Sequence, residues 1–339
     1  MKGNRPNLLA SLLQNFFGNH LCTLRGMSPH TIQRYRDNLV LLLRFLALHK
    51  NRPVSSLNLA DLGHQEIQAF LAHLEVERKN SVSTRNIRLS ALHSFFRFVA
   101  AQQPDRLEQA QRILGIPFKR TGSKVIDYLE YDEIQGILSV IDQTTTKGRR
   151  DYALMVTMFN TGARVQEILD LRACDLQLTK PFQLQLTGKG RKQRCCPLWP
   201  QTTQILRRLC MELHIDLKSE VRIFQNCKAA PLSRFGVRYI LKECLKHAQS
   251  SIPSLCSKRL HPHSMRHSTA VALLKSGVDL TTISQWLGHA DLSTTNRYAS
   301  IDLDMKRKAI ESIQPMENPG DCTKLWSHDN TILEWLESL

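Results

Sequence analysis

The sequence predicts a mainly α-helical protein with a small β-sheet, organised in two domains. Apolar residues recur at helical spacing through most of the 339 residues, and a single segment alternates with a period of two. An aromatic content of 6% and only 15 glycines argue against a turn-rich sandwich or barrel. A chain of this length can bury a core in each of two domains.

The first predicted domain, residues 1–101, consists of four amphipathic helices. They are expected at residues 7–24, from the capping pair Ser28 and Pro29 onward, at residues 56–77 and at residues 81–102. The fourth helix should bury one apolar stripe, formed by Ile87, Leu89, Leu92, Phe95, Phe96 and Val99. Residues 102–125 lose this periodicity and contain prolines and glycines, which predicts a linker.

The second predicted domain, residues 126–314, returns to helical spacing and contains one hairpin. A helix ends at Gly162, and residues 181–198 then alternate apolar and polar side chains around a Gly-Lys-Gly turn. Residues 315–339 form a tail with an apolar face at Ile332, Leu333, Trp335, Leu336 and Leu339. Such a tail either packs on its own domain or is donated to a neighbouring copy as an oligomerisation helix.

The charge of the chain favours a polyanionic partner. Lysine and arginine number 46 against 30 acidic residues, a formal net charge of +16, which suits nucleic acid or an anionic membrane surface. No apolar run reaches the roughly 18 residues of a membrane span, and the first twenty residues lack the unbroken apolar stretch of a signal peptide. Nine cysteines without a CxxC pair, including the adjacent Cys195 and Cys196, are typical of reduced thiols. These features predict a cytoplasmic protein that neither spans a membrane nor is exported.

Four motifs stand in the second domain, in the order NTGARVQEILDL, LTGKGRKQRCCPL, HPHSMRH and LGHADLSTTNRYAS. Together they resemble the catalytic domain of the tyrosine site-specific recombinases, the phage integrase family. The stretch SPHTIQRYRDNLVLLLRFL in the first domain is similar to the core-binding domain of that family. The resemblance implies a four-helix SAM-like core-binding domain, followed by a mixed α/β tyrosine recombinase catalytic domain.

The chemistry of such an enzyme explains the residue types in the motifs. A DNA phosphodiester is an anion, so its transesterification needs cations at the non-bridging oxygens, a hydroxyl held in line and a proton donor for the departing 5′ oxygen. Arginine suits the first task because its planar fork donates two parallel hydrogen bonds and keeps its charge. The resemblance implies six catalytic residues: Arg164, Lys189, His263, Arg266, His289 and Tyr298.

Each of these residues has an expected role by resemblance. Arg164 and Arg266 clamp the phosphate, and His263 accepts the tyrosine proton or stabilises the transition state. Lys189 protonates the leaving oxygen; Lys192 is its rival, but only Lys189 lies between two glycines, as in the family. His289 binds a non-bridging oxygen, and Tyr298 forms a 3′-phosphotyrosine ester. Glu167 orients Arg164, and neither ATP nor a metal is needed.

A zinc site is the alternative for the histidines. His263 and His267 stand four residues apart, as in a metalloprotease helix, but Ser264 occupies the position of the required glutamate. We therefore expect no metal and no other cofactor.

Basic residues outside the catalytic set are expected to contact DNA phosphates. They lie on the helices of the first domain, in the linker and at the hairpin tip: Arg34, Arg85, Arg88, Lys119, Arg120, Lys124, Arg191 and Lys192. A solvated charged face without a partner is the alternative for those on helices.

The resemblance therefore implies an enzyme that recombines double-stranded DNA at paired sites as a tetramer, with or without an accessory directionality factor. Integration and excision of a mobile element is the first expectation, and Xer-like resolution of chromosome or plasmid dimers is the second. A DNA-binding protein that has lost catalysis and a type IB topoisomerase are the alternatives from other classes.

Overall fold

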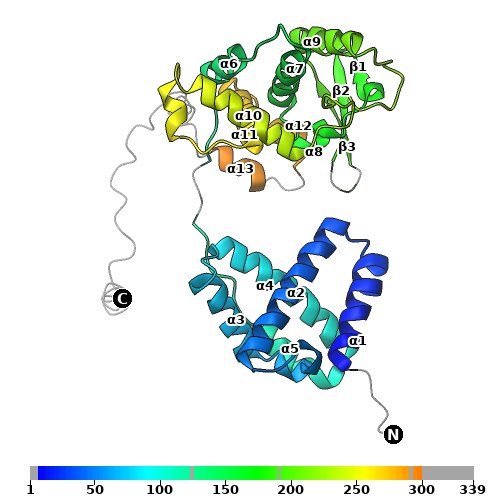
Figure 1. Ribbon diagram of the computed structural model, residues 1–339, viewed down its shortest axis with the longest axis vertical. Helices are drawn as coiled ribbons and strands as arrows, with labels where there is room; N and C mark the ends of the chain where they lie inside the picture. The colour runs from blue at the N-terminus through cyan, green and yellow to red at the C-terminus, as the bar shows by residue number, and fades with distance from the viewer. Residues whose placement is uncertain (1–6, 123–125, 189, 191, 290–292, 300–339) are drawn as a thin grey trace, which may run out of the picture. The chain divides into compact units, whose positions relative to one another are not determined.

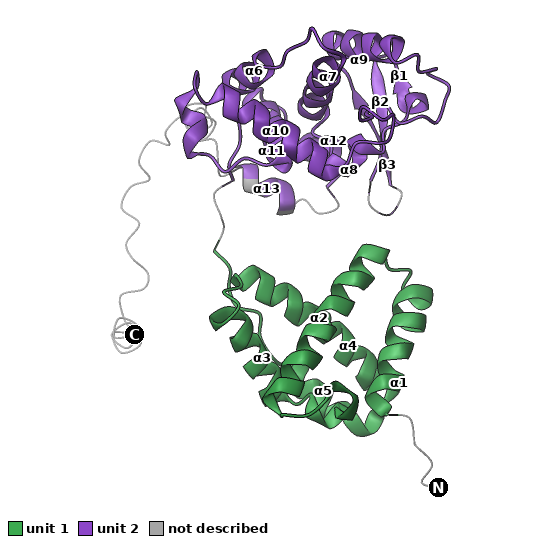
Figure 2. Cartoon of the chain, viewed as in Figure 1, with its two compact units in different colours: residues 1–124 green, residues 125–339 purple. Residues whose placement is uncertain are grey.

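The computed structural model describes residues 7–122, 126–188, 190, 192–289 and 293–299. The chain divides into two compact units, residues 1–124 and residues 125–339 (Figure 2). Both are built mainly from helices, and the second holds one small antiparallel sheet. The predicted fold class is confirmed.

In its described residues, the first unit contains five α-helices joined by short helical turns (Figure 1). In chain order its elements are α1 (Leu8–Asn15), a π-helix at Phe16–Leu24, α2 (Pro29–His49), 3₁₀ turns at Val54–Ser56 and Leu59–Asp61, α3 (His64–Val76), α4 (Val82–Gln102), a 3₁₀ turn at Pro104–Arg106 and α5 (Leu107–Leu114). The helix expected at residues 7–24 is thus split, and α5 adds a fifth helix to the four predicted.

Serine caps set the starts of the two longest helices. The hydroxyl oxygen of Ser28 accepts a hydrogen bond from the backbone N–H of Thr31 at 3.4 Å, as predicted for α2. Ser81 caps α4 in the same way through the N–H of Thr84 at 3.3 Å. Each cap satisfies one of the N–H groups that the first helical turn leaves without a partner.

The buried stripe of α4 follows the predicted pattern except at Ile87. Leu89, Leu92 and Phe95 are fully buried, whereas Ile87 is 62% exposed. An α-helix turns about 100° per residue, so Ile87 points about 200° away from Leu89 and cannot share its face. The prediction was wrong at Ile87 because it used the hydrophobicity of the residue and not its angular position on the helix.

Helix α5 lies inside the stretch that the sequence predicts as a linker. Its Ala110 and Ile113 are fully buried in the core of the first unit. The ring of His93, on α4, is hydrogen-bonded through Nε2 to the carbonyl of Ile113 at 3.1 Å. Residues 107–114 therefore belong to the first unit.

The second unit surrounds α7 with helices and a three-stranded sheet. Its elements are α6 (Tyr131–Ser139), α7 (Thr146–Thr161), α8 (Val165–Leu169), a 3₁₀ turn at Ala173–Asp175, β1 (Leu176–Gln177), β2 (Gln183–Thr187), β3 (Gln193–Pro197), α9 (Pro200–Glu212), α10 (Arg234–Ala248), a 3₁₀ turn at Pro253–Ser257, α11 (Pro262–Lys275), α12 (Leu280–Leu287) and α13 (Ser293–Ala299). The strand order is β1-β2-β3, and β2 and β3 pair from Gln183 with Pro197 to Thr187 with Gln193. The predicted hairpin is confirmed, and β1 is an additional strand.

Glycines end the two helices that lead into polar motifs of the second unit. Gly162 follows α7 with φ of 59°, and Gly288 follows α12 with φ of 65°. Only glycine adopts this left-handed conformation without strain, so both helices stop where the polar motifs begin. Among the described residues, no helix combines the length and the apolar character needed to cross a membrane.

Candidate active site

Three arginines meet at the C-terminal end of α12, which lies beside β3 and α11 (Figure 1). Their guanidinium groups donate to three consecutive carbonyls: Arg194 Nε to Trp286 at 3.0 Å, Arg266 Nη2 to Leu287 at 2.6 Å and Arg164 Nη2 to Gly288 at 3.2 Å. The last carbonyls of a helix lack intrahelical donors and carry the negative end of its dipole, so they attract cations. The fold thus brings the predicted Arg164 and Arg266 to one place, with Arg194 added.

Glu167 holds two of these arginines through one carboxylate. Its Oε1 accepts a hydrogen bond from Arg164 Nη1 at 2.7 Å, and its Oε2 accepts one from Arg194 Nη2, also at 2.7 Å. The backbone N–H of Arg164 adds a third, at 2.9 Å. Burial alone would raise the pKa of Glu167, but the bonds from Arg194 and from the Arg164 backbone hold that pKa below its ordinary value. Glu167 therefore stays ionised and fixes both guanidiniums.

Arg266 is the most deeply buried cation of the group, with 1% of its surface exposed. Its Nη1 donates to the carbonyl of Gly162 at 2.8 Å, which ties the end of α7 to the end of α12. Burial, together with the charges of Arg164 and Arg194, lowers the pKa of Arg266 to about 10, so the group stays charged at neutral pH. Its Nε has no hydrogen-bond partner among the described residues.

Three histidines lie around this arginine cluster. Nδ1 of His289 is 2.7 Å from the hydroxyl oxygen of Thr295, and the ring of His263 packs edge-on against His267 with centroids 4.6 Å apart. Desolvation, followed by the charge of Arg266, lowers the pKa of His263 and of His289 to about 4, although His263 is an exposed residue. The imidazoles of His263 and His289 are therefore neutral at pH 7.

Tyr298 lies on α13, and its hydroxyl group contacts a histidine. The distance from its Oη to Nδ1 of His267 is 2.8 Å. Only 2% of Tyr298 is exposed, because its ring packs in a small apolar cluster with residues such as Leu274 and Leu287. The phenol is therefore covered in this structure.

Sequence reasoning missed two residues of this site, His267 and Arg194. His267 was considered only as a zinc ligand together with His263. Its position directly after Arg266 in HPHSMRH could have indicated that it belongs to this site. Arg194 stands on β3 between exposed neighbours, and its inward orientation follows from the alternation of the strand.

Comparison with known proteins identifies the protein family to which this site belongs. The model of the phage integrase family matches residues 127–304, and the N-terminal SAM-like domain of phage integrases matches residues 14–103. The chain belongs to the phage integrase family. It is a tyrosine recombinase, an enzyme that cuts and rejoins DNA.

Relatives of this recombinase include an integrase/recombinase and a Xer protein. It is 38% identical to y4rC of Sinorhizobium fredii, provisionally named an integrase/recombinase, over 98% of each chain. Tyrosine recombinase XerC of Bacillus pumilus is 28% identical, over 89% of this chain and 96% of that protein.

Solved structures share the fold. The XerH site-specific recombinase, bound to a palindromic difH substrate after cleavage, superposes with a TM-score of 0.66 at 21% identity, covering 85% of this chain and 81% of that one. The integrase of transposon Tn1549, in complex with transposon right-end DNA, gives a TM-score of 0.65 at 19% identity over 88% and 98%.

Some of the residues singled out in the sequence lie outside the described part of the chain. Lys189 and Arg191 lie outside the described residues, as do Lys124 and the tail of residues 315–339. Lys192 is exposed, and its carbonyl accepts a hydrogen bond from the N–H of Gly188 at 2.8 Å, which closes the hairpin. The roles of Lys189 and Lys192 stay predictions.

The residues predicted to bind DNA in the first unit differ in exposure. Arg34 and Arg120 are exposed, while Arg88 is half-buried. Lys119 is exposed and forms an ion pair with Glu75 at 2.7 Å.

Arg85 does not lie on the surface. It is only 6% exposed, and its Nη1 donates to the carbonyl of Pro117 at 3.0 Å and to Asn86 Oδ1 at 3.1 Å. Its side chain attaches the end of the first unit to α4, so this structure gives it an internal role instead of the expected DNA contact.

Two further features bear on ligands. Within the described part of the chain, no three His, Cys, Asp or Glu side chains are arranged to hold a metal ion.

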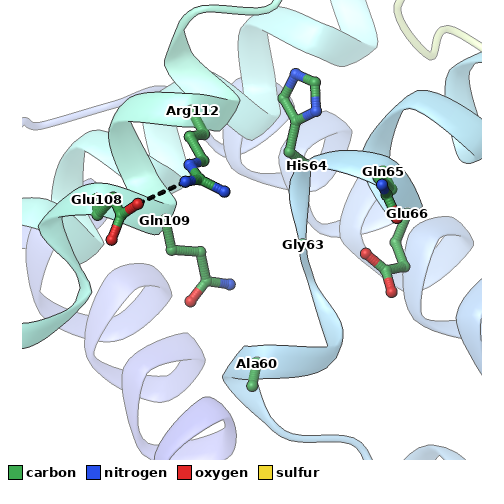
Figure 3. A pocket seen from close by; sticks show the side chains of 8 residues that line it. All are labelled: Ala60, Gly63, His64, Gln65, Glu66, Glu108, Gln109 and Arg112. Carbon is green, nitrogen blue, oxygen red and sulfur yellow. Dashed lines mark hydrogen bonds and ion pairs between the residues drawn. The ribbon is translucent and has the colours of Figure 1, made fainter.

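A polar cavity in the first unit is lined by residues that include His64, Gln109 and Arg112 (Figure 3). Arg112 is paired there with Glu108 at 2.6 Å, and Gln109 donates to the carbonyls of Leu59 and Leu62. Arg112, Glu108 and Gln109 are thus engaged within the fold, and none of the catalytic candidates lines this cavity.

Proposed function

We propose that this recombinase cleaves and rejoins DNA at specific sites through Tyr298, and that its task is the integration and excision of a mobile genetic element. The observation that carries the chemistry is the convergence of distant segments. Arg164 follows α7, Arg266 stands on α11 and His289 follows α12, and all three lie around the end of α12, with Tyr298 packed against the same helices. A phosphate placed there would meet two guanidiniums and neutral imidazoles next to a phenol.

The proposed reaction is a transesterification in which atoms and charges balance. The Tyr298 oxygen bonds to phosphorus, the bond from phosphorus to the 5′ oxygen breaks, and the phenol proton passes to a neutral imidazole. Lys189 gives a proton to the departing 5′ oxygen. The 3′-phosphotyrosine ester keeps the energy of the broken bond, so a 5′ hydroxyl of a second strand reverses the step without ATP or metal.

The assembly belongs to the same proposal. Recombination joins two DNA sites. Lambda integrase, which shares this fold, has been solved as a dimer bound to a COC′ core site. We propose a tetramer on two paired sites, in which the tail of residues 315–339 docks on a neighbouring copy in a closed ring. An accessory factor would set the direction of the reaction.

A covalent adduct tests the chemistry. Full-length protein is incubated with sheared genomic DNA of the source organism and denatured, and the protein-linked fragments are sequenced. Wild type and Tyr239→Phe, a control at an exposed tyrosine of α10, should yield the same adduct at defined junctions. Tyr298→Phe should yield none. An adduct retained by Tyr298→Phe would remove the proposal.

Dimer resolution is the second candidate, favoured by the likeness to XerC. Plasmids that carry the mapped junctions separate the two roles. Release of a circle with joined element ends supports the mobile-element role, whereas conversion of plasmid dimers to monomers supports resolution. Relaxation of plasmids that lack the site would instead indicate a topoisomerase, and binding without any adduct a silent DNA-binding protein.

A further inference from the structure

Arg194 has no assigned role, yet its side chain connects three parts of the site. It stands on β3 opposite Leu186 of β2, in the strand that returns from the hairpin turn. Its side chain is only 12% exposed. Burying a guanidinium is costly unless its donors are paired, so the contacts of Arg194 show what the fold uses it for.

Those contacts reach Glu167 and the C-terminal end of α12, both of which border the proposed phosphate site. Nη2 of Arg194 lies 2.7 Å from Oε2 of Glu167, whose other oxygen holds Arg164. Nε of Arg194 donates to the carbonyl of Trp286 at 3.0 Å, in the last turn of α12 just before His289. One side chain therefore fixes both Glu167 and the helix end from which His289 follows.

The balance of charge explains why a second arginine is needed here. One carboxylate faces two guanidiniums, so the Arg164–Glu167–Arg194 group keeps a net positive charge. The side chain of Arg164 is 39% exposed, and it is the member of the group that a phosphate can reach. Without Arg194, Glu167 would neutralise Arg164 alone, and the attraction for an anion would fall.

We propose that Arg194 is a positioning residue for strand cleavage, which holds Glu167 and the end of α12 so that Arg164 and His289 face the scissile phosphate. This inference rests on the proposed function of the site. It assigns to Arg194 no contact with the DNA itself.

The experiment compares Arg194→Gln and Arg194→Lys with wild type in the full-length protein. The substrate is a synthetic duplex of the junction mapped through the Tyr298 adduct, with a nick that traps the cleaved state. Arg172→Gln is the control, because Arg172 pairs with Glu220 on the surface and touches none of the site residues. We expect duplex affinity within about twofold of wild type for all variants, and adduct formation about 100-fold slower for Arg194→Gln. Arg194→Lys keeps the positive charge but lacks the fork that spans Glu167 and Trp286, so it should recover only part of the rate lost in Arg194→Gln.

A second substrate separates positioning from general damage to the fold. In a duplex with a methylphosphonate at the cleavage position, the charge that Arg164 must neutralise is absent. The defect of Arg194→Gln should shrink there to less than about tenfold, and combining it with Glu167→Gln should add little. Equal defects on both substrates, or wild-type cleavage of the phosphate substrate by Arg194→Gln, would overturn the inference. Failure of the proposed function is a different result, since it appears as adduct formation by Tyr298→Phe.

Discussion

The hydroxyl oxygen of Tyr298 lies 2.8 Å from Nδ1 of His267, a residue on a different helix. Burial, then the neighbouring His263, lower the pKa of His267 to about 4, so its ring is neutral at physiological pH. A neutral imidazole in hydrogen-bond contact with a phenol is placed to take its proton. The contact therefore gives the proposed nucleophile an immediate proton acceptor, a role that the resemblance to the family assigns to His263.

His267→Gln tests that partnership. Glutamine can still hydrogen-bond to the phenol but offers no basic nitrogen, so cleavage at pH 7 should fall by roughly 100-fold while DNA binding persists. The defect should narrow at high pH, where hydroxide can take the phenol proton in place of an imidazole. His247→Gln, at an exposed histidine of α10, serves as the control, and rates of adduct formation are measured from pH 6 to 10. A His267→Gln defect that is constant over this range would contradict proton transfer to His267.

The same histidines predict how folding stability depends on pH. The pKa of His267 and of His289 is about 4 in the folded protein, against an ordinary value of 6.5. Between these values the unfolded chain binds protons that the folded chain does not, so stability falls as the pH drops from about 6.5 toward 4. Urea unfolding at pH 7.5 and pH 5 should show a lower midpoint at pH 5, and His267→Gln should lessen the difference. A wild-type urea midpoint that is equal at pH 7.5 and pH 5 would show that the pKa values of His267 and His289 are not lowered in the folded protein.

A pair of glycines separates backbone strain from damage to the arginine cluster. Gly288 has φ of 65°, and an added Cβ would lie 3.0 Å from Cδ and 3.1 Å from Nη1 of Arg194. Gly277 has φ of 84° with open space around it. Alanine should cost roughly 1 kcal/mol of unfolding free energy at either position, from strain alone. Only Gly288→Ala should also slow adduct formation, by at least about tenfold. Similar activity of the two variants would mean that the close approach of Arg194 does not matter.

Two arginines of the first unit should respond in opposite ways. Arg34→Gln, at an exposed site on α2, should weaken binding to a mixed-sequence duplex a few-fold at low salt and leave stability within about 0.5 kcal/mol. Arg85→Gln should lower the unfolding free energy by about 1–3 kcal/mol, because it removes a charged donor to the carbonyl of Pro117. Urea titration and fluorescence anisotropy measure the two effects. Loss of DNA affinity without loss of stability in Arg85→Gln would restore its predicted place on the DNA surface.

The sequence by itself determined the helical fold class, the start of α2 at Ser28, the end of α7 at Gly162 and the hairpin of β2 and β3. These are local properties, set by the spacing of apolar residues and by residues that cap or break a helix, so neighbouring positions suffice to predict them. The motifs also indicated which arginines, histidines and tyrosine belong to one site.

Tertiary structure alone decided which of these side chains touch. His267 and Tyr298 come from different helices, and Arg194 reaches Glu167 and Trp286 across the domain, so no local pattern records their contacts. The same is true of Arg85. Its charge predicts a position on the surface, but the packing of residues 107–117 against α4 buries it. A side chain's charge is written in the sequence, but its partner depends on where distant segments meet.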